Sequence, residues 1–157
     1  MNLFEKILIG AMLSVALIMG TFHNPFAKSN TDILPNFVID KVYDGDTIYI
    51  TFKDIPDILG KKLGLRLSRI DAPEINDKDT CIRGMAEISQ KELTSFIAKG
   101  RKFEIVHVKR DKYFRLDADL LVDGKSASQH MLEVKRAQFY DGKGAKPLWV
   151  CQLDWFN

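Results

Sequence analysis

Three short segments of the sequence concentrate acidic and arginine side chains that could do chemistry together. They are DGDT at 44–47, RLSRIDAPE at 66–74 and RDKYFR at 110–115. Carboxylate and carbonyl oxygens are the ligands of hard divalent cations such as calcium. Guanidinium groups bind phosphate oxygens through two parallel hydrogen bonds. Together the segments contain the groups that hydrolysis of a phosphodiester needs.

Each type of side chain fits one task in that reaction. Asp46 and Asp71 could hold a metal ion that offsets charge on the phosphate. Arg66 and Arg115 could bind the phosphate and stabilise its transition state. Glu74 could orient or deprotonate the attacking water.

Each segment taken alone also has a simpler interpretation. DGDT could be a hairpin turn whose acids accept hydrogen bonds from backbone amides. Residues 71–74 could be a turn that ends in a helix-starting glutamate. Arg115 could pair with Asp117 across a strand, and RDKYFR could be a solvated loop. Only their occurrence together favours a functional site.

Alternating apolar residues predict the strands that would position these segments. Strands are expected at 36–42, 46–53, 63–67, 102–108 and 115–122, with a loop at 54–61. Apolar positions from 82 to 97 have helical spacing, and Gly100 is a plausible C-terminal cap of this helix. Ser126 and Gln129 are spaced as the capping box of a short helix that reaches about residue 134. This order is typical of an OB-type barrel.

The three segments also carry a family resemblance. V-x-D-G-D-T at 42–47, R-L-x-x-I-D-A-P-E at 66–74 and D-K-Y-x-R at 111–115 resemble motifs of the staphylococcal nuclease (thermonuclease) family. The match runs from about residue 38 to 140. It implies an α+β fold, a five-stranded OB-fold β-barrel with two or three helices. It also implies a monomeric, calcium (Ca2+)-dependent nuclease that cleaves DNA, RNA or both and leaves 3′-phosphates.

The resemblance assigns roles to individual residues by their place in the motifs. Tyr140 is a looser match, to a tyrosine that lines the nucleotide pocket. The implied metal ligands are Asp46, Asp71 and the main-chain carbonyl of Ala72; the catalytic residues are Arg66, Glu74 and Arg115; the substrate-binding residues are Lys112, Tyr113 and Tyr140.

Phe114 departs from the family pattern, because a glycine is common just before the second arginine. Glycine often serves a turn with positive φ, so Phe114 could change how Arg115 is presented. The ring could offer a stacking surface to a base or pack against its neighbours.

The first 22 residues differ in composition from the rest. From Ile7 to Gly20 every residue except Ser14 is apolar or glycine. As a helix this run would span about 21 Å, less than a bilayer core requires. It therefore favours a signal peptide, with a membrane anchor or a buried helix as alternatives. We expect an exported protein with three parts. Residues 1–22 would be a signal peptide or N-terminal membrane anchor, residues 23–33 a linker, and residues 34–157 the nuclease-like domain.

The two cysteines fit export to the periplasm, the medium or the outer side of a membrane. In an oxidising compartment Cys81 and Cys151 would form a disulfide; two separate buried thiols are the alternative. Exported relatives in the family carry similar cysteines, which supports the pairing. The net charge of only +2 is not that of a protein that coats nucleic acid non-specifically. A non-catalytic binding module and a structural protein of the envelope remain rival functions.

Overall fold

The computed structural model describes residue 34 and residues 36–111 and 113–156. All of them lie in one compact unit. The expected signal peptide or anchor at 1–22 and the linker at 23–33 lie outside the described residues. In the part that is described, no helix is long and apolar enough to cross a membrane.

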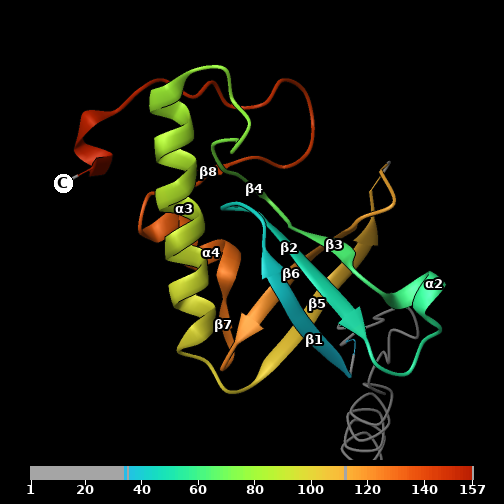
Figure 1. The fold of residues 1–157 in the computed structure, drawn as a ribbon. Coiled ribbons are helices and arrows are strands. Elements are labelled where there is room, and N and C mark those ends of the chain that lie inside the picture. Colours follow the sequence, from blue (N-terminus) through green and yellow to red (C-terminus); the bar gives the residue numbers. More distant parts are fainter. Residues whose placement is uncertain (1–33, 35, 112, 157) are drawn as a thin grey trace, which may run out of the picture. The chain divides into compact units, whose positions relative to one another are not determined.

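A curled sheet of mixed strands forms the centre of the fold (Figure 1). Its strand order is β1-β2-β3-β6-β5, and the short β7 pairs with β6. An isolated bridge between Leu34 and Ile105 joins the chain before β1 to β5, so the sheet curls toward closure. The strands are β1 (Phe37–Val42), β2 (Thr47–Phe52), β3 (Leu63–Leu67), β5 (Phe103–Arg110), β6 (Leu116–Val122) and β7 (Lys125–Ser126).

One pairing in this sheet is parallel. Strands β3 and β6 run in the same direction, with Leu65 opposite Leu116 and Arg66 opposite Asp117. The other neighbours are antiparallel. A curled mixed sheet with helices packed on it is the α+β, OB-fold-like arrangement that the sequence predicts.

Buried and exposed side chains alternate along the strands, so that one face of a strand packs into the shared core. In β6 the residues Leu116, Ala118, Leu120 and Val122 are buried, while the residues between them are partly exposed. Arg66 lies on the opposite face of β3 from the buried Leu65 and Leu67, so it points away from this core.

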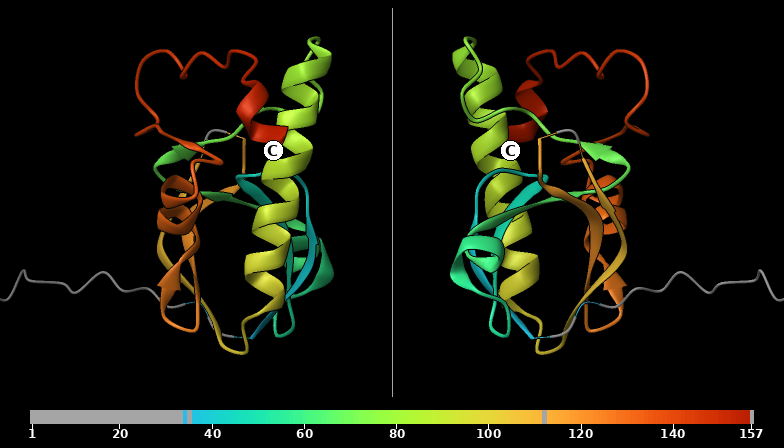
Figure 2. Two further views of the ribbon diagram at one scale, coloured as in Figure 1. Left: turned by 90° about the vertical axis from the view of Figure 1, so that its left-hand side faces the viewer. Right: turned by 90° about the vertical axis from the view of Figure 1, so that its right-hand side faces the viewer.

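The long helix α3 stands alongside the sheet (Figure 2), and α4 contacts both α3 and β6. Asp79 caps α3 by accepting a hydrogen bond from the Cys81 amide. Ser126 caps α4 by accepting a hydrogen bond from the Gln129 amide, which is one of the two bonds of the predicted capping box; the Gln129 side chain donates to Glu133. The helices are α2 (Asp57–Gly60), α3 (Thr80–Ala98), α4 (Ala127–Glu133) and the 3-10 turn η1 (Leu153–Phe156).

Two features depart from the sequence-based expectation. The expected loop at 54–61 contains the single helical turn α2, which begins directly after Pro56. A second sheet pairs β4 (Ile70–Asp71) with β8 (Gln138–Phe139) in antiparallel register. Strands of two residues are too short to show a periodic pattern. Nevertheless, β4 carries one of the predicted metal ligands, Asp71.

The C-terminal residues 140–152, called the strap below, connect β8 to η1. A disulfide joins Cys151 of the strap to Cys81 in the first turn of α3, with 5.6 Å between the two Cα atoms. The predicted cysteine pairing is therefore present. Beyond the strap, Trp155 of η1 is buried, and the guanidinium of Arg136 lies 4.9 Å from its ring centroid. The pairing of β8 with β4 holds the other end, so the strap is fixed at both ends.

Candidate active site

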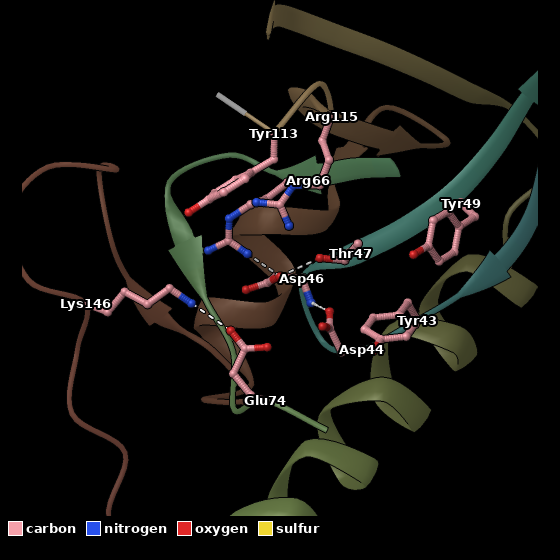
Figure 3. Close-up of a pocket in the computed structure, with 10 residues that line it drawn as sticks. All are labelled: Tyr43, Asp44, Asp46, Thr47, Tyr49, Arg66, Glu74, Tyr113, Arg115 and Lys146. Carbon is pink, nitrogen blue, oxygen red and sulfur yellow. Dashed lines mark hydrogen bonds and ion pairs between the residues drawn. The ribbon is translucent and has the colours of Figure 1, made fainter. Parts of the chain in front are cut away.

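The three motif segments converge on one pocket (Figure 3). The turn between β1 and β2, the strand β3, the hairpin between β5 and β6, and the strap all contribute side chains. The lining residues are Tyr43, Asp44, Asp46, Thr47, Tyr49, Arg66, Glu74, Tyr113, Arg115 and Lys146.

Asp46 is buried in the β1–β2 turn, and both of its carboxylate oxygens have partners. Oδ2 accepts a hydrogen bond from the Ala72 amide at 2.9 Å, and Oδ1 accepts from the Thr47 hydroxyl at 2.9 Å. The bond to Ala72 ties the turn to the chain just after β4. A Cβ on Gly45 would stand 1.9 Å from Oγ of Ser89 and 2.8 Å from Cβ of Ala72. Only glycine lets the turn approach α3 and Ala72 this closely.

Arg66 joins the two predicted metal carboxylates. Its Nη1 is ion-paired with Asp46, and its Nη2 lies 3.2 Å from Oδ1 of Asp71. Nη2 also donates to the Ile70 carbonyl at 2.9 Å. Burial alone would lower the pKa of Arg66, but the charges of Asp46 and Asp71 and the hydrogen bond to Asp46 outweigh it and raise that pKa. The guanidinium is therefore a permanent cation at the floor of the pocket.

Asp71 is 1% exposed and is held from three directions. Its Oδ1 contacts Arg66 and also lies 3.0 Å from Nζ of Lys146. Its Oδ2 accepts a hydrogen bond from the indole Nε1 of Trp149 at 3.0 Å. Two of these three donors come from the strap, although the strap shows no motif in the sequence.

Glu74 lies at the rim of the pocket, with 55% of its side chain exposed. Its Oε1 accepts a hydrogen bond from Lys146 Nζ at 2.7 Å. Lys146 thus bonds to Asp71 and Glu74 at once (Figure 3 draws the bond to Glu74). Burial lowers the pKa of Lys146, but its hydrogen bonds to Glu74 and Asp71 outweigh burial and raise it.

Arg115 reaches the pocket from the hairpin between β5 and β6. Its stem passes over β3 at Gly64, where an added Cβ would stand 3.1 Å from Cγ of Arg115. Its Nε donates to Oδ2 of Asp111 at 2.7 Å, and its guanidinium lies 5.5 Å from the ring centroid of Tyr113. The alternative pairing with Asp117 is therefore wrong: the hairpin's own Asp111 holds Arg115.

Asp111 also organises the backbone of this hairpin. Its Oδ1 accepts hydrogen bonds from the amides of Tyr113 (2.7 Å) and Arg115 (2.9 Å). Burial would raise the pKa of Asp111, but the hydrogen bonds from Arg115 and from these amides lower it. Asp111 therefore fixes the backbone at Tyr113 and Arg115.

Phe114 adopts the backbone conformation that glycine favours. Its φ is 63°, inside the left-handed region. The ring is 75% exposed, and the guanidinium of Arg110 lies 5.9 Å from its centroid. Phe114 therefore does not prevent this turn from forming, and Arg115 still reaches the pocket.

Asp44 is a buried acid beside the predicted metal ligands. Its Oδ1 accepts a hydrogen bond from the Asp46 amide at 3.0 Å. Burial first, and the negative charge of Asp46 second, raise the pKa of Asp44 to about 7. Two carboxylates this close in a buried turn favour the binding of a positive charge.

The predicted substrate-binding residues differ in whether they line the pocket. Tyr113 lines the pocket, whereas Lys112 lies outside the described residues. Tyr140 does not line the pocket, because its hydroxyl donates to the Gly144 carbonyl at 3.2 Å within the strap. Sequence reasoning missed Lys146, because a lysine in a tail without periodicity carries no signal.

The donor set at Asp46 and Asp71 fits a hard divalent cation, since all candidate ligands are oxygens. Both carboxylates contact the same guanidinium, and the Ala72 residue is adjacent to Asp71. Within the described ranges, no group of three or more His, Cys, Asp or Glu side chains is arranged to hold a metal ion. A metal ion here would have the Asp46 and Asp71 carboxylates and the Ala72 main-chain carbonyl as its donors from this chain, and of these three residues Asp46 lines the pocket.

The sequence of the chain is similar to those of known proteins. No family model matches the chain. Endonuclease YncB of Bacillus subtilis (strain 168) is 32% identical over 117 residues, which are 73% of this chain and 50% of that protein. The SPbeta prophage-derived endonuclease YokF of the same organism is 32% identical over 103 residues, 64% of this chain and 32% of that protein. The chain thus spans half the length of the first relative and about a third of the second.

Proposed function

Since the chain belongs to the staphylococcal nuclease-like family, we propose that it is a nuclease that hydrolyses phosphodiester bonds of DNA, RNA or both. One observation carries the proposal: the guanidinium groups of Arg66 and Arg115 line the same pocket as the carboxylates of Asp46 and Glu74. This pocket combines cations for a phosphate with acids for a metal ion and a water. The endonucleases to which the chain is similar support the same activity.

The two arginines bind and polarise the phosphate. Arg66 presents its guanidinium from the buried side and Arg115 presents its own from the hairpin. A guanidinium gives two parallel hydrogen bonds to phosphate oxygens and stays charged at any physiological pH. Both groups are held by carboxylates before the substrate arrives, so little reorganisation is needed when charge develops in the transition state.

Calcium is the proposed cofactor. Asp46 and Asp71 would hold it through their carboxylates and Ala72 through its main-chain carbonyl. When bound, the ion supplies positive charge that offsets the charge growing on the phosphate oxygens.

Glu74 is the proposed partner of the attacking water. As the water oxygen bonds to phosphorus, the bond from phosphorus to the 5′ oxygen breaks and the water proton passes to Glu74. The leaving 5′ oxygen takes a proton from solvent, and the phosphate remains on the 3′ end. The exposure of Glu74 at the rim gives water access to its carboxylate.

We also infer that the protein works outside the cytoplasm. The disulfide between Cys81 and Cys151 supports this location, because such bonds persist in oxidising compartments.

The activity is tested on the full chain with double-stranded DNA and with RNA, in calcium and in excess chelator. We expect cleavage in calcium, loss of cleavage with chelator, and 3′-phosphate ends on the products. Glu74→Gln and Arg115→Ala should each lower the rate at least 100-fold. Glu87→Gln and Arg101→Ala, at exposed positions away from the pocket, are the matched controls. Cleavage that ignores the chelator and both site substitutions would contradict the mechanism. Binding without cleavage would instead identify a non-catalytic module.

A further inference from the structure

Lys146 is a charged pocket residue for which the reaction described above has no role. Its ammonium stands between two site carboxylates, 3.0 Å from Oδ1 of Asp71 and 2.7 Å from Oε1 of Glu74. Among the described residues, no other side chain donates a hydrogen bond to Glu74. The orientation of that exposed carboxylate therefore depends on Lys146.

The strap fixes the position of Lys146 from both sides. Upstream, the Tyr140 hydroxyl donates to the Gly144 carbonyl at 3.2 Å. Downstream, Trp149 donates to Asp71 and packs edge-to-face on Trp155, with ring centroids 5.6 Å apart. Two residues further on, Cys151 is bonded to α3.

This anchoring separates Lys146 from an ordinary surface lysine. An exposed ion pair contributes little, because two long side chains lose freedom to form it and water screens it. Here Asp71 is buried and is also held by Arg66 and Trp149, so the Lys146 ammonium is fixed on one side by a rigid group. Glu74, which is more exposed, then takes its place against that fixed ammonium.

We propose that Lys146 is a positioning residue, which holds the Glu74 carboxylate in the pocket beside Asp71 so that Glu74 can act on the water. This inference rests on the proposed nuclease function. A misplaced general base slows the chemical step more than it weakens binding. The position of Lys146 should therefore affect kcat and not KM.

The test is a double-mutant cycle of Lys146→Met with Glu74→Gln, measured as kcat and KM of the full chain. We expect Lys146→Met to lower kcat at least tenfold and to change KM less than twofold. In the Glu74→Gln background the same substitution should change kcat less than twofold. Lys146→Arg, which keeps a donor and the charge, should recover most of the rate. Lys143→Met, on the exposed part of the same strap, is the matched control and should have no effect.

Three results would overturn the inference. One is an unchanged kcat in Lys146→Met. Another is an equal loss of kcat in both backgrounds, which would mean that Lys146 does not act through Glu74. The third is a raised KM at constant kcat, which would make Lys146 a phosphate ligand. If the wild-type chain cleaves nothing, the proposed function fails instead. The contact can then still be checked by whether the Tm shifts of the two substitutions are non-additive.

Discussion

Arg66 is the residue on which the candidate site is built. Asp46 and Asp71 are 3% and 1% exposed, and two ionised carboxylates cannot remain buried without compensating charge. The guanidinium supplies part of that charge to each, because its two terminal nitrogens reach one carboxylate each, and the Lys146 ammonium adds a second positive charge at Asp71. The same group therefore stabilises the fold and is the candidate ligand of the substrate phosphate.

Arg66→Lys should separate the effect of the positive charge from the effect of the guanidinium geometry. A lysine keeps the positive charge, but a single ammonium cannot reproduce the planar fork that bridges the two carboxylates. We expect kcat/KM to fall about 100-fold or more and the free energy of unfolding to fall by about 1–3 kcal/mol. Cleavage kinetics and urea denaturation measure the two effects. Arg69→Lys, at an exposed position, is the control, and equal losses in both variants would refute the special role of Arg66.

Phe114 offers a second test at the level of one residue, because its φ of 63° is costly for any side chain with a Cβ. The left-handed conformation costs about 1–2 kcal/mol for residues other than glycine. We therefore expect Phe114→Gly to be about 1 kcal/mol more stable than Phe114→Ala in urea denaturation. Both variants lose the ring and its contact with Arg110, so their difference isolates the backbone. Equal stability would mean that the turn relaxes to another conformation when the ring is removed.

The sequence predicts the charged pocket better than it predicts what surrounds it. Asp46, Arg66, Glu74 and Arg115 lie in dense motifs next to strand ends, and the structure gathers all four. Lys146 could not be found in this way, because only the tertiary path of the strap brings it to Glu74.

At the scale of elements, the parallel pairing of β3 with β6 brings the two arginines together. Leu65 is opposite Leu116, so Arg66 on β3 and Arg115 just before β6 lie near each other. The Arg115 stem then crosses β3 at Gly64, where the absence of a side chain leaves room. Two segments that are distant in the chain thus present their arginines to one pocket through this strand pairing.

Long elements were predictable and short ones were not. Strong alternation in β2 and β6, and helical spacing in α3, identify elements that bury a whole face. The strands β4 and β8 have two residues each, and α2 is one turn. Their formation depends on tertiary pairing and not on local preference. Since β4 positions Asp71, part of the site geometry could not be derived from local patterns.

Gly45→Ala should displace the turn that carries Asp46. The new Cβ would overlap Oγ of Ser89 and Cβ of Ala72, so the turn must move away from α3 or α3 must shift. Overpacking of this kind costs about 1–3 kcal/mol, and we expect the upper end of that range together with loss of cleavage. Gly142→Ala is the control, because its Cβ would meet nothing within 4 Å and only the positive φ is strained. Urea denaturation and cleavage assays on both variants would decide, and an active Gly45→Ala protein would contradict the close approach.

At the scale of the whole molecule, the disulfide links the end of the chain to its long helix and so carries the strap across the site. Cys81 and Cys151 are separated by 70 residues, and a cross-link that closes a loop of this length stabilises a fold by about 4 kcal/mol in the chain-entropy model. We therefore expect reduction to lower the free energy of unfolding by about that amount. The measurement is urea denaturation of the oxidised protein and of the protein reduced and alkylated, with intact mass to confirm the state of both thiols. Cys81→Ser with Cys151→Ser, which cannot reoxidise, should match the reduced protein. A reduced protein as stable as the oxidised one would show that Trp155 and the other contacts of the tail hold the strap without the disulfide.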